Sequence, residues 1–462
     1  MKIAVIGGGT TGYIAASHIS KYFPQFDLYH IFDSAIPTIG VGEGTIPCFL
    51  EWLDKITGLS YAELEKRCHI TRKFGIRFEN WGKKYDNFFH HFYPIDEEYS
   101  YSYHISAKEI VNLLQEYITA TYIDDQVLDI QSDGIAANII LANHTNLEVD
   151  LVIDARGFPQ ALDENYIQLS WIPTNAALIR QIPGEHDHTI KLKLGKNLRQ
   201  YDTATRSIAR PHGWIFTIPL TNRTSYGYIY NGKISSIAEI EADFNQFFEL
   251  EGINYNGQAK HLNFPNFAVR NCFDGAVFKI GNSASFLEPL EATAIGCILT
   301  QLKAISYWVL SSFAKLEKRG KLDESQLKIF NNYFLKYVYK MSLFVGWHYT
   351  MGSSFDSKFW TFAQANFYQE IEKLPNKEVL EEFNKILASS QELPHPIENF
   401  LEFSSTVANT EISIFAVMIK GVSKFFGQWT QPSFTEVGYG IGYFKAPSSL
   451  ENSASEFVNS TK

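Results

Sequence analysis

A glycine-rich loop near the start of the chain has the residue types and the spacing that bind a dinucleotide. Gly7, Gly9 and Gly12 form a G-x-G-x-x-G pattern between an apolar run and a helical segment. Glycines at these positions let the backbone approach a pyrophosphate and place it at the positive N-terminus of a helix. Asp33 follows Gly12 by 21 residues, where a carboxylate would hydrogen-bond ribose hydroxyls. The pattern predicts a dinucleotide site without separating FAD from NAD, and the alternative is a glycine turn needed only for packing.

A second glycine-bearing segment, Ile280-Gly281-Asn282, follows a strand-like run that begins at Ala276. Flavoproteins often reach the ribityl chain of FAD with such a turn, so the segment favours FAD over NAD. Taken alone, the same residues are equally typical of an ordinary turn at the end of a strand.

The elements expected around the loop form a βαβ nucleotide unit. It consists of strand Lys2–Ile6, a helix over Tyr13–Tyr22 and strand Asp27–Phe32. Short β-branched runs at 139–141 and 149–153 lead to Asp154 and predict a strand that rejoins this sheet.

The middle and the C-terminal part of the chain have different patterns. Residues 207–230 alternate apolar and polar around a turn at 221–223, which predicts an antiparallel hairpin. After Gly296 the strand signals fade, and periodic segments such as Gln326–Tyr339 and Lys377–Leu387 predict helices up to about Phe425. We therefore expect three regions: an FAD-binding unit at 1–300, a helical substrate-covering region at 301–446 and a polar, disordered tail at 447–462.

Composition and charge limit the partners. A net charge of −10 gives no basic surface for nucleic acid or for anionic membranes, so small molecules are expected. The longest apolar stretch, Ala294–Phe313, contains polar residues and predicts a buried helix instead of a membrane span. The N-terminal residues predict a strand and not a signal peptide. Four scattered cysteines show neither a zinc spacing nor a disulfide framework, which fits a cytoplasmic protein. His186-Asp187-His188 lacks a third partner in this loop, so no metal is assigned.

Four further segments resemble the flavin-dependent halogenases of the tryptophan halogenase family. They are I36-P-T-I-G-V-G-E-G-T-I-P47, T71-R-K-F-G-I-R-F-E-N-W81, W214-I-F-T-I-P219 and F286-L-E-P-L-E-A-T-A294. Three positions depart from the family pattern, which usually has Trp at Phe216, Ser at Ala292 and Gly at Ala294. Weaker similarity extends to about residue 360 and includes Trp347-His348-Tyr349.

The resemblance implies a flavin-monooxygenase-like α/β fold of the Rossmann type, with an added antiparallel sheet and a helical C-terminal region. It also implies that reduced FAD and O2 oxidise a halide to hypohalous acid, which halogenates an electron-rich aromatic substrate. Lys73 would carry or hydrogen-bond this oxidant, and Glu291 would be the catalytic carboxylate. The implied cofactor-binding residues are Gly7, Gly9, Thr10, Thr11, Gly12, Asp33, Ile39, Gly40, Val41, Gly42, Glu43, Gly281, Asn282 and Ile295.

The family pattern implies two further groups of residues. The amides of Thr293 and Ala294, at the start of a helix, would bind the halide. The substrate would be lined by His90, Phe92, Trp214 and Phe216. The residues that clamp the amino-acid end of free tryptophan are not found in the C-terminal part, so tryptophan is not the first choice of substrate.

Each of these residues also has an ordinary structural explanation. A lone lysine such as Lys73 usually lies on the surface, and Glu291 could simply stabilise the dipole of the helix that begins near Ala292. Trp214 and Phe216 fit the buried face of a strand, and adjacent histidines such as His90-His91 are common in loops. Only the surrounding motifs favour the catalytic interpretation.

The absence of a second NAD fingerprint predicts a separate flavin reductase as partner. Two other functions stay open: a flavin-dependent aromatic hydroxylase of the same fold, and a degenerate flavin-binding protein without turnover. The sequence does not determine the halide, the substrate or the oligomeric state. It is compatible with a homo-oligomer.

Overall fold

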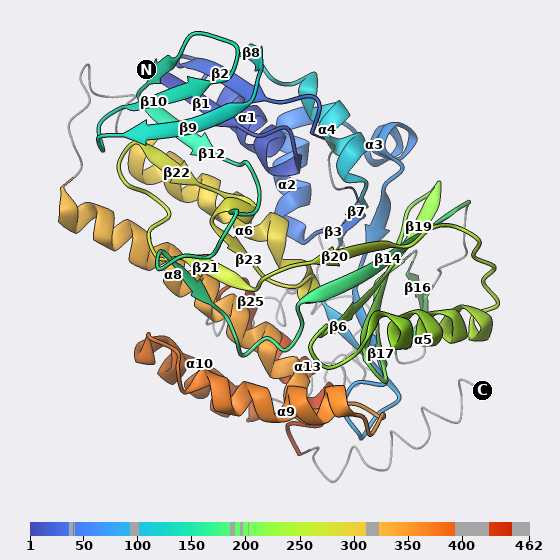
Figure 1. Cartoon of the computed structure of the whole chain (residues 1–462). Helices are drawn as coiled ribbons and strands as arrows, with labels where there is room; N and C mark the ends of the chain where they lie inside the picture. The colour runs from blue at the N-terminus through green and yellow to red at the C-terminus, as the bar shows by residue number, and fades with distance from the viewer. Residues whose placement is uncertain are drawn as a thin grey trace, which may run out of the picture.

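A five-stranded parallel sheet carries the glycine-rich loop (Figure 1). The computed structural model describes residues 1–36, 40, 42–92, 101–184, 190–194, 197–201, 203–310, 323–392 and 425–445. In sheet order the strands are β22 (Val277–Lys279), β12 (Leu151–Asp154), β1 (Lys2–Ile6), β2 (Asp27–Phe32) and β8 (Thr121–Asp124). Pairing of β12 beside β1 confirms that the strand ending at Asp154 rejoins the nucleotide sheet.

Helices and a small sheet surround the parallel sheet. The apolar side chains of Ile3 and Val5 on β1 pack in one core, and those of Ala4 and Ile6 pack in another, because alternate residues of a strand face opposite ways. The first core includes residues of α1 (Thr10–Tyr22), α2 (Pro47–Thr57), α3 (Tyr61–Cys68), α4 (Ala107–Gln115) and α6 (Thr293–Ile305). The second lies against the antiparallel strands β9 (Val127–Ser132), β10 (Ala137–Leu141) and β11 (Leu147–Val149).

A seven-stranded sheet lies beside this unit, with α5 (Ile237–Leu250) against one face (Figure 1). Its strands in order are β20 (Lys260–Asn263), β14 (Ala176–Pro183), β19 (Arg223–Tyr230), β18 (Gly213–Pro219), β17 (Thr205–Arg210), β5 (Gly75–Glu79) and β6 (Asn87–His91). The predicted hairpin is confirmed as β18–β19. All neighbours are antiparallel except β17 and β5, which run parallel.

Three smaller strand groups are separate from these two sheets. One contains β3 (Glu43–Gly44), β7 (Ser102–Ile105) and β4 (Thr71–Lys73). Another contains β13 (Tyr166–Gln168), β21 (Phe267–Val269) and β23 (Ser285–Phe286), and β15 (Ile190–Leu194) pairs with β16 (Asn197–Tyr201). The first group brings the Glu43 and Lys73 segments onto the two sides of β7.

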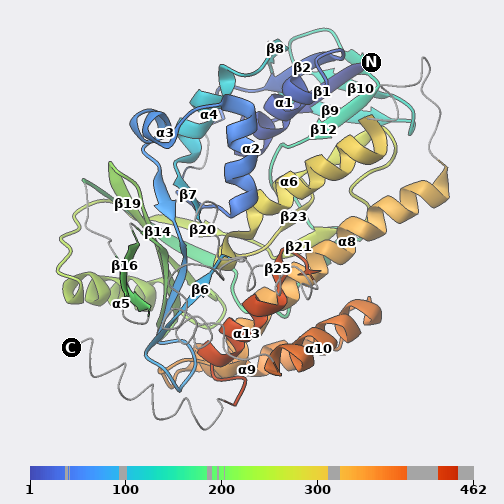
Figure 2. The ribbon, with the colours of Figure 1, turned by 180° about the vertical axis from the view of Figure 1, so that it is seen from behind.

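The C-terminal part is helical, as predicted. It contains α8 (Glu324–Trp347), the short helix η4 (His348–Met351), α9 (Lys358–Ile371), α10 (Lys377–Gln391) and α13 (Gln431–Gly440). A two-stranded turn, β24 (Phe425–Phe426) and β25 (Trp429–Thr430), precedes α13. Figure 2 shows α6, α8 and α13 leading from the nucleotide unit toward α9 and α10 at the opposite end. The predicted tail at 447–462 lies outside the described residues.

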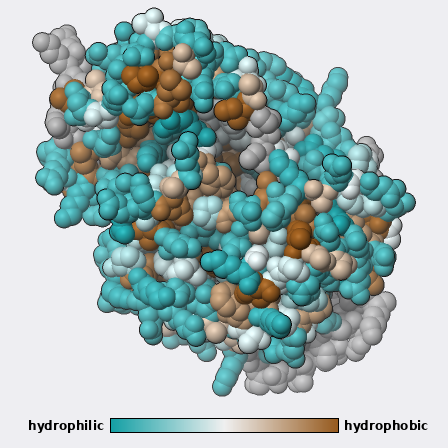
Figure 3. Space-filling model, viewed as in Figure 1, coloured by the Kyte–Doolittle hydropathy of each residue, from teal (hydrophilic) through white to brown (hydrophobic). Residues whose placement is uncertain are grey.

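The surface in Figure 3 is mainly polar, with apolar side chains scattered in small groups. Among the described helices, none combines the length and the apolar character needed to cross a bilayer.

Candidate active site

The glycine-rich loop joins β1 to α1, and neighbouring backbone leaves no room for a side chain at Gly7 or Gly12. A Cβ atom at Gly7 would lie 2.4 Å from the backbone oxygen of Ala155, and one at Gly12 would lie 2.0 Å from the backbone oxygen of Gly7. Gly9 caps α1 without a side-chain hydrogen bond, and the first turn contains no acidic residue. The first amides of α1 are therefore available to an anion. Asp33 directly follows β2, and its Oδ1 accepts a 2.9 Å hydrogen bond from the amide of Ala35.

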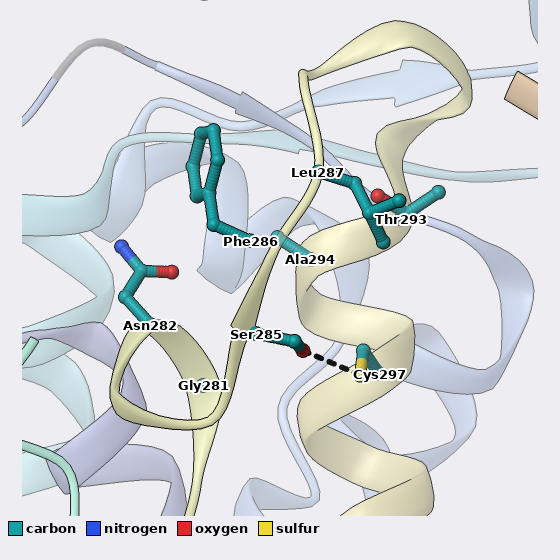
Figure 4. Close-up of a pocket in the computed structure, with 8 residues that line it drawn as sticks. All are labelled: Gly281, Asn282, Ser285, Phe286, Leu287, Thr293, Ala294 and Cys297. Carbon is teal, nitrogen blue, oxygen red and sulfur yellow. Dashed lines mark hydrogen bonds between the residues drawn. The ribbon is translucent and has the colours of Figure 1, made fainter. Parts of the chain in front are cut away.

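The second glycine turn lies against the start of α6, and a pocket opens between them (Figure 4). Gly281 and Asn282 line one side of this pocket, and Thr293 and Ala294 line the other. The turn also contacts the first loop, because a Cβ atom at Gly281 would lie 2.6 Å from the hydroxyl oxygen of Thr11. The structure thus brings predicted cofactor-binding and halide-binding residues into one continuous region, while Ile295 is buried beside it.

The segment around Gly42 lies across the seven-stranded sheet. Gln181 on β14 donates a 3.1 Å hydrogen bond to the backbone oxygen of Gly40. A Cβ atom at Gly42 would lie 3.0 Å from the hydroxyl oxygen of Ser225 on β19. Glu43 then enters β3 opposite Ile105. Ile39 and Val41 lie outside the described residues.

Lys73 ends β4, and its side chain is completely buried. No hydrogen-bond partner reaches its Nζ atom among the residues that the structure describes. The amine lies 5.3 Å from the centre of the Phe92 ring and 3.1 Å from the position that a Cβ atom at Gly44 would take. Burial lowers the pKa of Lys73 to about 8, although the charge of Glu291 counteracts part of this shift. A fraction of neutral, nucleophilic amine is consequently available near neutral pH.

Glu291 lies in the turn before α6 and is also buried. Its Oε1 atom accepts hydrogen bonds from Nδ1 of His90 at 2.9 Å and from Nε2 of His348 at 3.0 Å. Its Oε2 atom accepts a 3.3 Å hydrogen bond from the indole of Trp429. Burial acts to raise the pKa of Glu291, but the charge of His90 and the histidine hydrogen bonds outweigh it and hold the pKa well below its usual range.

The backbone that presents Glu291 is strained. Glu291 and Ala292 have φ angles of 69° and 54°, in the left-handed region that side chains other than glycine seldom adopt. This geometry ends the helical turn η2 (Leu290–Ala292), and α6 then begins at Thr293. The Cβ atom of Ala292 lies 3.6 Å from the position that a Cβ atom at Gly44 would take, so this turn and the Lys73 amine meet at the same point of the fold.

A second buried carboxyl, Glu288, lies three residues earlier and anchors the aromatic strand β18. The hydroxyl of Tyr349 donates to Glu288 at 2.6 Å, and the indole of Trp214 donates to Tyr349 at 2.7 Å. Thr174 donates to the other Glu288 oxygen. Burial raises the pKa of Glu288 to about 7, and the hydrogen bonds from Thr174 and Tyr349 oppose the rise.

Phe216, the neighbour of Trp214 on the same face of β18, lies over Gly227 of β19. A Cβ atom at Gly227 would be 2.2 Å from the Phe216 ring, so glycine makes room for it. The ring centres of Trp214 and Phe216 are 6.4 Å apart.

The C-terminal segment completes the site. Glu436 on α13 accepts hydrogen bonds from the His91 ring at 2.6 Å and from the His91 amide at 2.8 Å. Trp429 stacks on Phe344 of α8, with ring centres 4.1 Å apart, while its indole reaches Glu291. Residues more than 130 positions apart therefore share one hydrogen-bond network.

A family model named tryptophan halogenase matches residues 2–99 and 93–450, which is nearly the whole chain. The chain belongs to the tryptophan halogenase family. Tryptophan 6-halogenase of Streptomyces toxytricini is 24% identical over 376 residues, covering 64% of this chain and 69% of that protein. Tryptophan 7-halogenase of Lentzea aerocolonigenes is 24% identical over 370 residues, covering 64% and 67% of the two chains.

Solved structures share the halogenase fold over almost the full length. The crystal structure of the Streptomyces toxytricini tryptophan 6-halogenase superimposes with a TM-score of 0.73 and 19% identity, covering 97% of this chain and 92% of that one. A flavin-dependent halogenase from Brevundimonas sp. BAL3 gives a TM-score of 0.70 at 18% identity, covering 98% and 94%. The expected flavin-halogenase fold is therefore confirmed, with its parallel sheet, antiparallel strands and helical C-terminal region.

Sequence reasoning missed four residues of this halogenase-family site as contributors to it: Glu288, His348, Trp429 and Glu436. His348 lies in a segment that resembles the family, and Glu288 lies in the Glu291 motif, so these two had a detectable signal. Trp429 and Glu436 had none, because only the tertiary fold brings them to Glu291 and His91. Within the described part of the chain no cluster of three metal-ligating side chains occurs, and His186–His188 lies outside it.

Proposed function

We propose that this protein is a reduced-FAD-dependent halogenase that acts on an electron-rich aromatic substrate. One observation carries the proposal: the buried Lys73 amine has no hydrogen-bond partner among the described residues and lies where the Glu291 turn meets β3. An unpaired buried ammonium is costly, so a fold that keeps one has a use for it.

The described residues fit FAD. The cradle at Gly7 and Gly12 excludes side chains, the first turn of α1 has no acid, and the turn at Gly281 lies against Thr11 of the same loop. These residues would hold the pyrophosphate and the ribityl chain, with Thr10, Thr11 and Asp33 beside them and Gly40, Gly42 and Glu43 across the sheet. When bound in its reduced form, FAD with O2 and a halide supplies hypohalous acid. The amides of Thr293 and Ala294 would hold the halide.

The chain's own residues would then direct the oxidant. Lys73 can hydrogen-bond hypohalous acid or exchange its halogen onto the neutral amine. Glu291, held as a carboxylate, can orient the oxidant and stabilise the cationic ring intermediate of electrophilic substitution. His90, Phe92, Trp214 and Phe216 would line the space for the aromatic ring.

The proposal includes a separate flavin reductase that supplies reduced FAD, and a cytoplasmic location, which is consistent with the four unpaired cysteines.

The test incubates the purified chain with FAD, a flavin reductase and NADH. Chloride, bromide and iodide are each supplied with a panel of indoles and phenols, and products are read by mass spectrometry. Lys73→Ala is assayed in parallel, with its FAD affinity as the control for folding. Halogenated product from the wild type but not from Lys73→Ala is expected. Hydroxylated product would make the protein a monooxygenase, and flavin binding without any product would favour a degenerate site.

A further inference from the structure

Both ring nitrogens of His348 contact hydrogen-bond acceptors. Nδ1 lies 2.8 Å from the backbone oxygen of Phe344, and Nε2 lies 3.0 Å from Oε1 of Glu291. A backbone oxygen only accepts, so Nδ1 must carry a hydrogen. A neutral imidazole has only one such hydrogen, and it is used at Nδ1. The contact between His348 and Glu291 therefore needs one more proton, which lies either on Nε2 or on the carboxyl group.

The surroundings of Glu291 place this proton on His348. Besides His348, Nδ1 of His90 donates to Oε1 at 2.9 Å and the indole of Trp429 donates to Oε2 at 3.3 Å. Hydrogen bonds donated to a carboxylate favour its charged form, and two or three of them suffice to keep it ionised. These hydrogen bonds favour a carboxylate paired with an imidazolium.

The two histidines that contact Glu291 differ in how many of their ring nitrogens must carry a hydrogen. His90 is required to donate only through Nδ1, which its neutral form can do, although the charge and the hydrogen bond of Glu291 outweigh burial and raise the pKa of His90. His348 has to donate through both nitrogens. Of the two, only His348 is required by its hydrogen bonds to be doubly protonated while Glu291 is ionised.

Other charged groups face this pair from several elements. Lys73 on β4 acts on Glu291 by its charge, and His90 on β6 is itself influenced by Glu436 of α13. Glu288 accepts a hydrogen bond from Tyr349, the residue that follows His348. The rings of Phe78, Trp81 and Phe344 surround His348 and exclude water from it. The shared proton is therefore shielded from bulk solvent on the His348 side. Oε2 of Glu291 accepts one long hydrogen bond from the described residues, so it is the oxygen better able to contact a reactant.

We propose that the Glu291–His348 pair donates one proton to the oxygen of hypohalous acid and then accepts one proton from the aromatic ring. This step rests on the proposed halogenase function. As the ring carbon attacks the halogen, a carbon–halogen bond forms and the halogen–oxygen bond breaks. Its electron pair stays on oxygen, which takes the proton of the pair and leaves as water. The ring C–H bond then breaks, its electrons restore aromaticity, and the proton returns to the pair through Glu291. His348 acts through Glu291 and is thus a positioning residue that also stores the proton.

The protonation state can be measured without any substrate. The chain is labelled with ¹⁵N in its histidine rings, and the His348 signals are assigned by their loss in His348→Gln. Because both His348 nitrogens lie against acceptors, we expect both to show the chemical shifts of protonated ring nitrogens. One unprotonated nitrogen would overturn the proposal.

Activity measurements then distinguish two roles of His348: storing a proton, and only orienting Glu291. In His348→Gln the amide can still donate to Glu291 but cannot store a proton, so we expect kcat to fall by ~100-fold with little change in KM. His261→Gln, on the edge strand β20, is the matched control and should stay near the wild-type rate. Wild-type kcat in His348→Gln, with unchanged FAD affinity, would overturn the proton role alone. Absence of halogenation in the wild type, with an imidazolium at His348, would count against the proposed function and this step together.

Discussion

The indole of Trp214 donates a 2.7 Å hydrogen bond to the hydroxyl of Tyr349, which in turn donates to Glu288 at 2.6 Å. All three side chains are almost fully buried, so the chain of hydrogen bonds fixes the rotamer of Trp214 on β18. It also ties β18 to the segment that leads into Glu291.

Tyr349→Phe removes the acceptor of Trp214 and a donor to Glu288. We expect a loss of about 1–3 kcal/mol in the free energy of unfolding, because both groups stay buried without this partner. Urea denaturation measures this, with Tyr333→Phe on the exposed side of α8 as the control. Trp214→Phe in combination should show a coupling of about 0.5–3 kcal/mol with Tyr349→Phe, and strictly additive effects would argue against the hydrogen bond.

Glu288 should make stability depend on pH. Its pKa is raised to about 7 in the folded protein, so between the unfolded value near 4.3 and about 7 the folded state binds more protons. Stability contributed by this group is therefore present at low pH and lost as pH rises through about 7. Relative to wild type, Glu288→Gln should gain about 2–3 kcal/mol between pH 5 and pH 8. A constant difference between the two denaturation curves over this range would contradict the assignment.

Lys73 should have the opposite pH dependence. Its pKa is lowered to about 8, so between about 8 and the unfolded value near 10.4 the unfolded chain binds more protons and stability rises with pH. Lys73→Met should thus exceed wild type in stability by about 2–3 kcal/mol at pH 7, with the gain shrinking toward pH 10. The exposed Lys55→Met serves as control in the same thermal and urea titrations. A Met variant less stable than wild type at pH 7 would mean that Lys73 is better solvated than its burial indicates.

Gly12→Ala should strongly weaken FAD binding. The added methyl would lie 2.0 Å from the backbone oxygen of Gly7, and backbone cannot move aside without opening the loop. We expect FAD affinity to fall by at least ~100-fold in a fluorescence titration. Gly232→Ala is the control, since its methyl would meet nothing closer than 3.7 Å. Normal FAD binding by Gly12→Ala would refute the loop as the pyrophosphate site.

Local patterns predicted much of this fold. The βαβ unit, the β18–β19 hairpin and the long helices α8 and α10 follow from periodicity within short segments, and the structure has them close to the expected bounds. Helix α1 begins at Thr10, three residues before the expected start, because the glycine loop itself provides the first turn.

The partners of Glu291 could not be predicted in the same way. The bonds from His90, His348 and Trp429 span 201, 57 and 138 positions, and no periodicity links residues at such separations. The left-handed backbone at Glu291 and Ala292 also has no local signal, since neither is a residue that favours it. The motif identified Glu291, whereas the tertiary fold determines its charge.

The contact from Trp429 to Glu291 has a consequence during protein synthesis. The indole donor lies 138 positions after its acceptor in the sequence, so it leaves the ribosome well after Glu291. Until then the carboxylate lacks its indole donor, and His91 lacks Glu436. A ribosome-stalled or prematurely terminated chain would thus lack the part of the hydrogen-bond network that its last residues supply to Glu291 and His91.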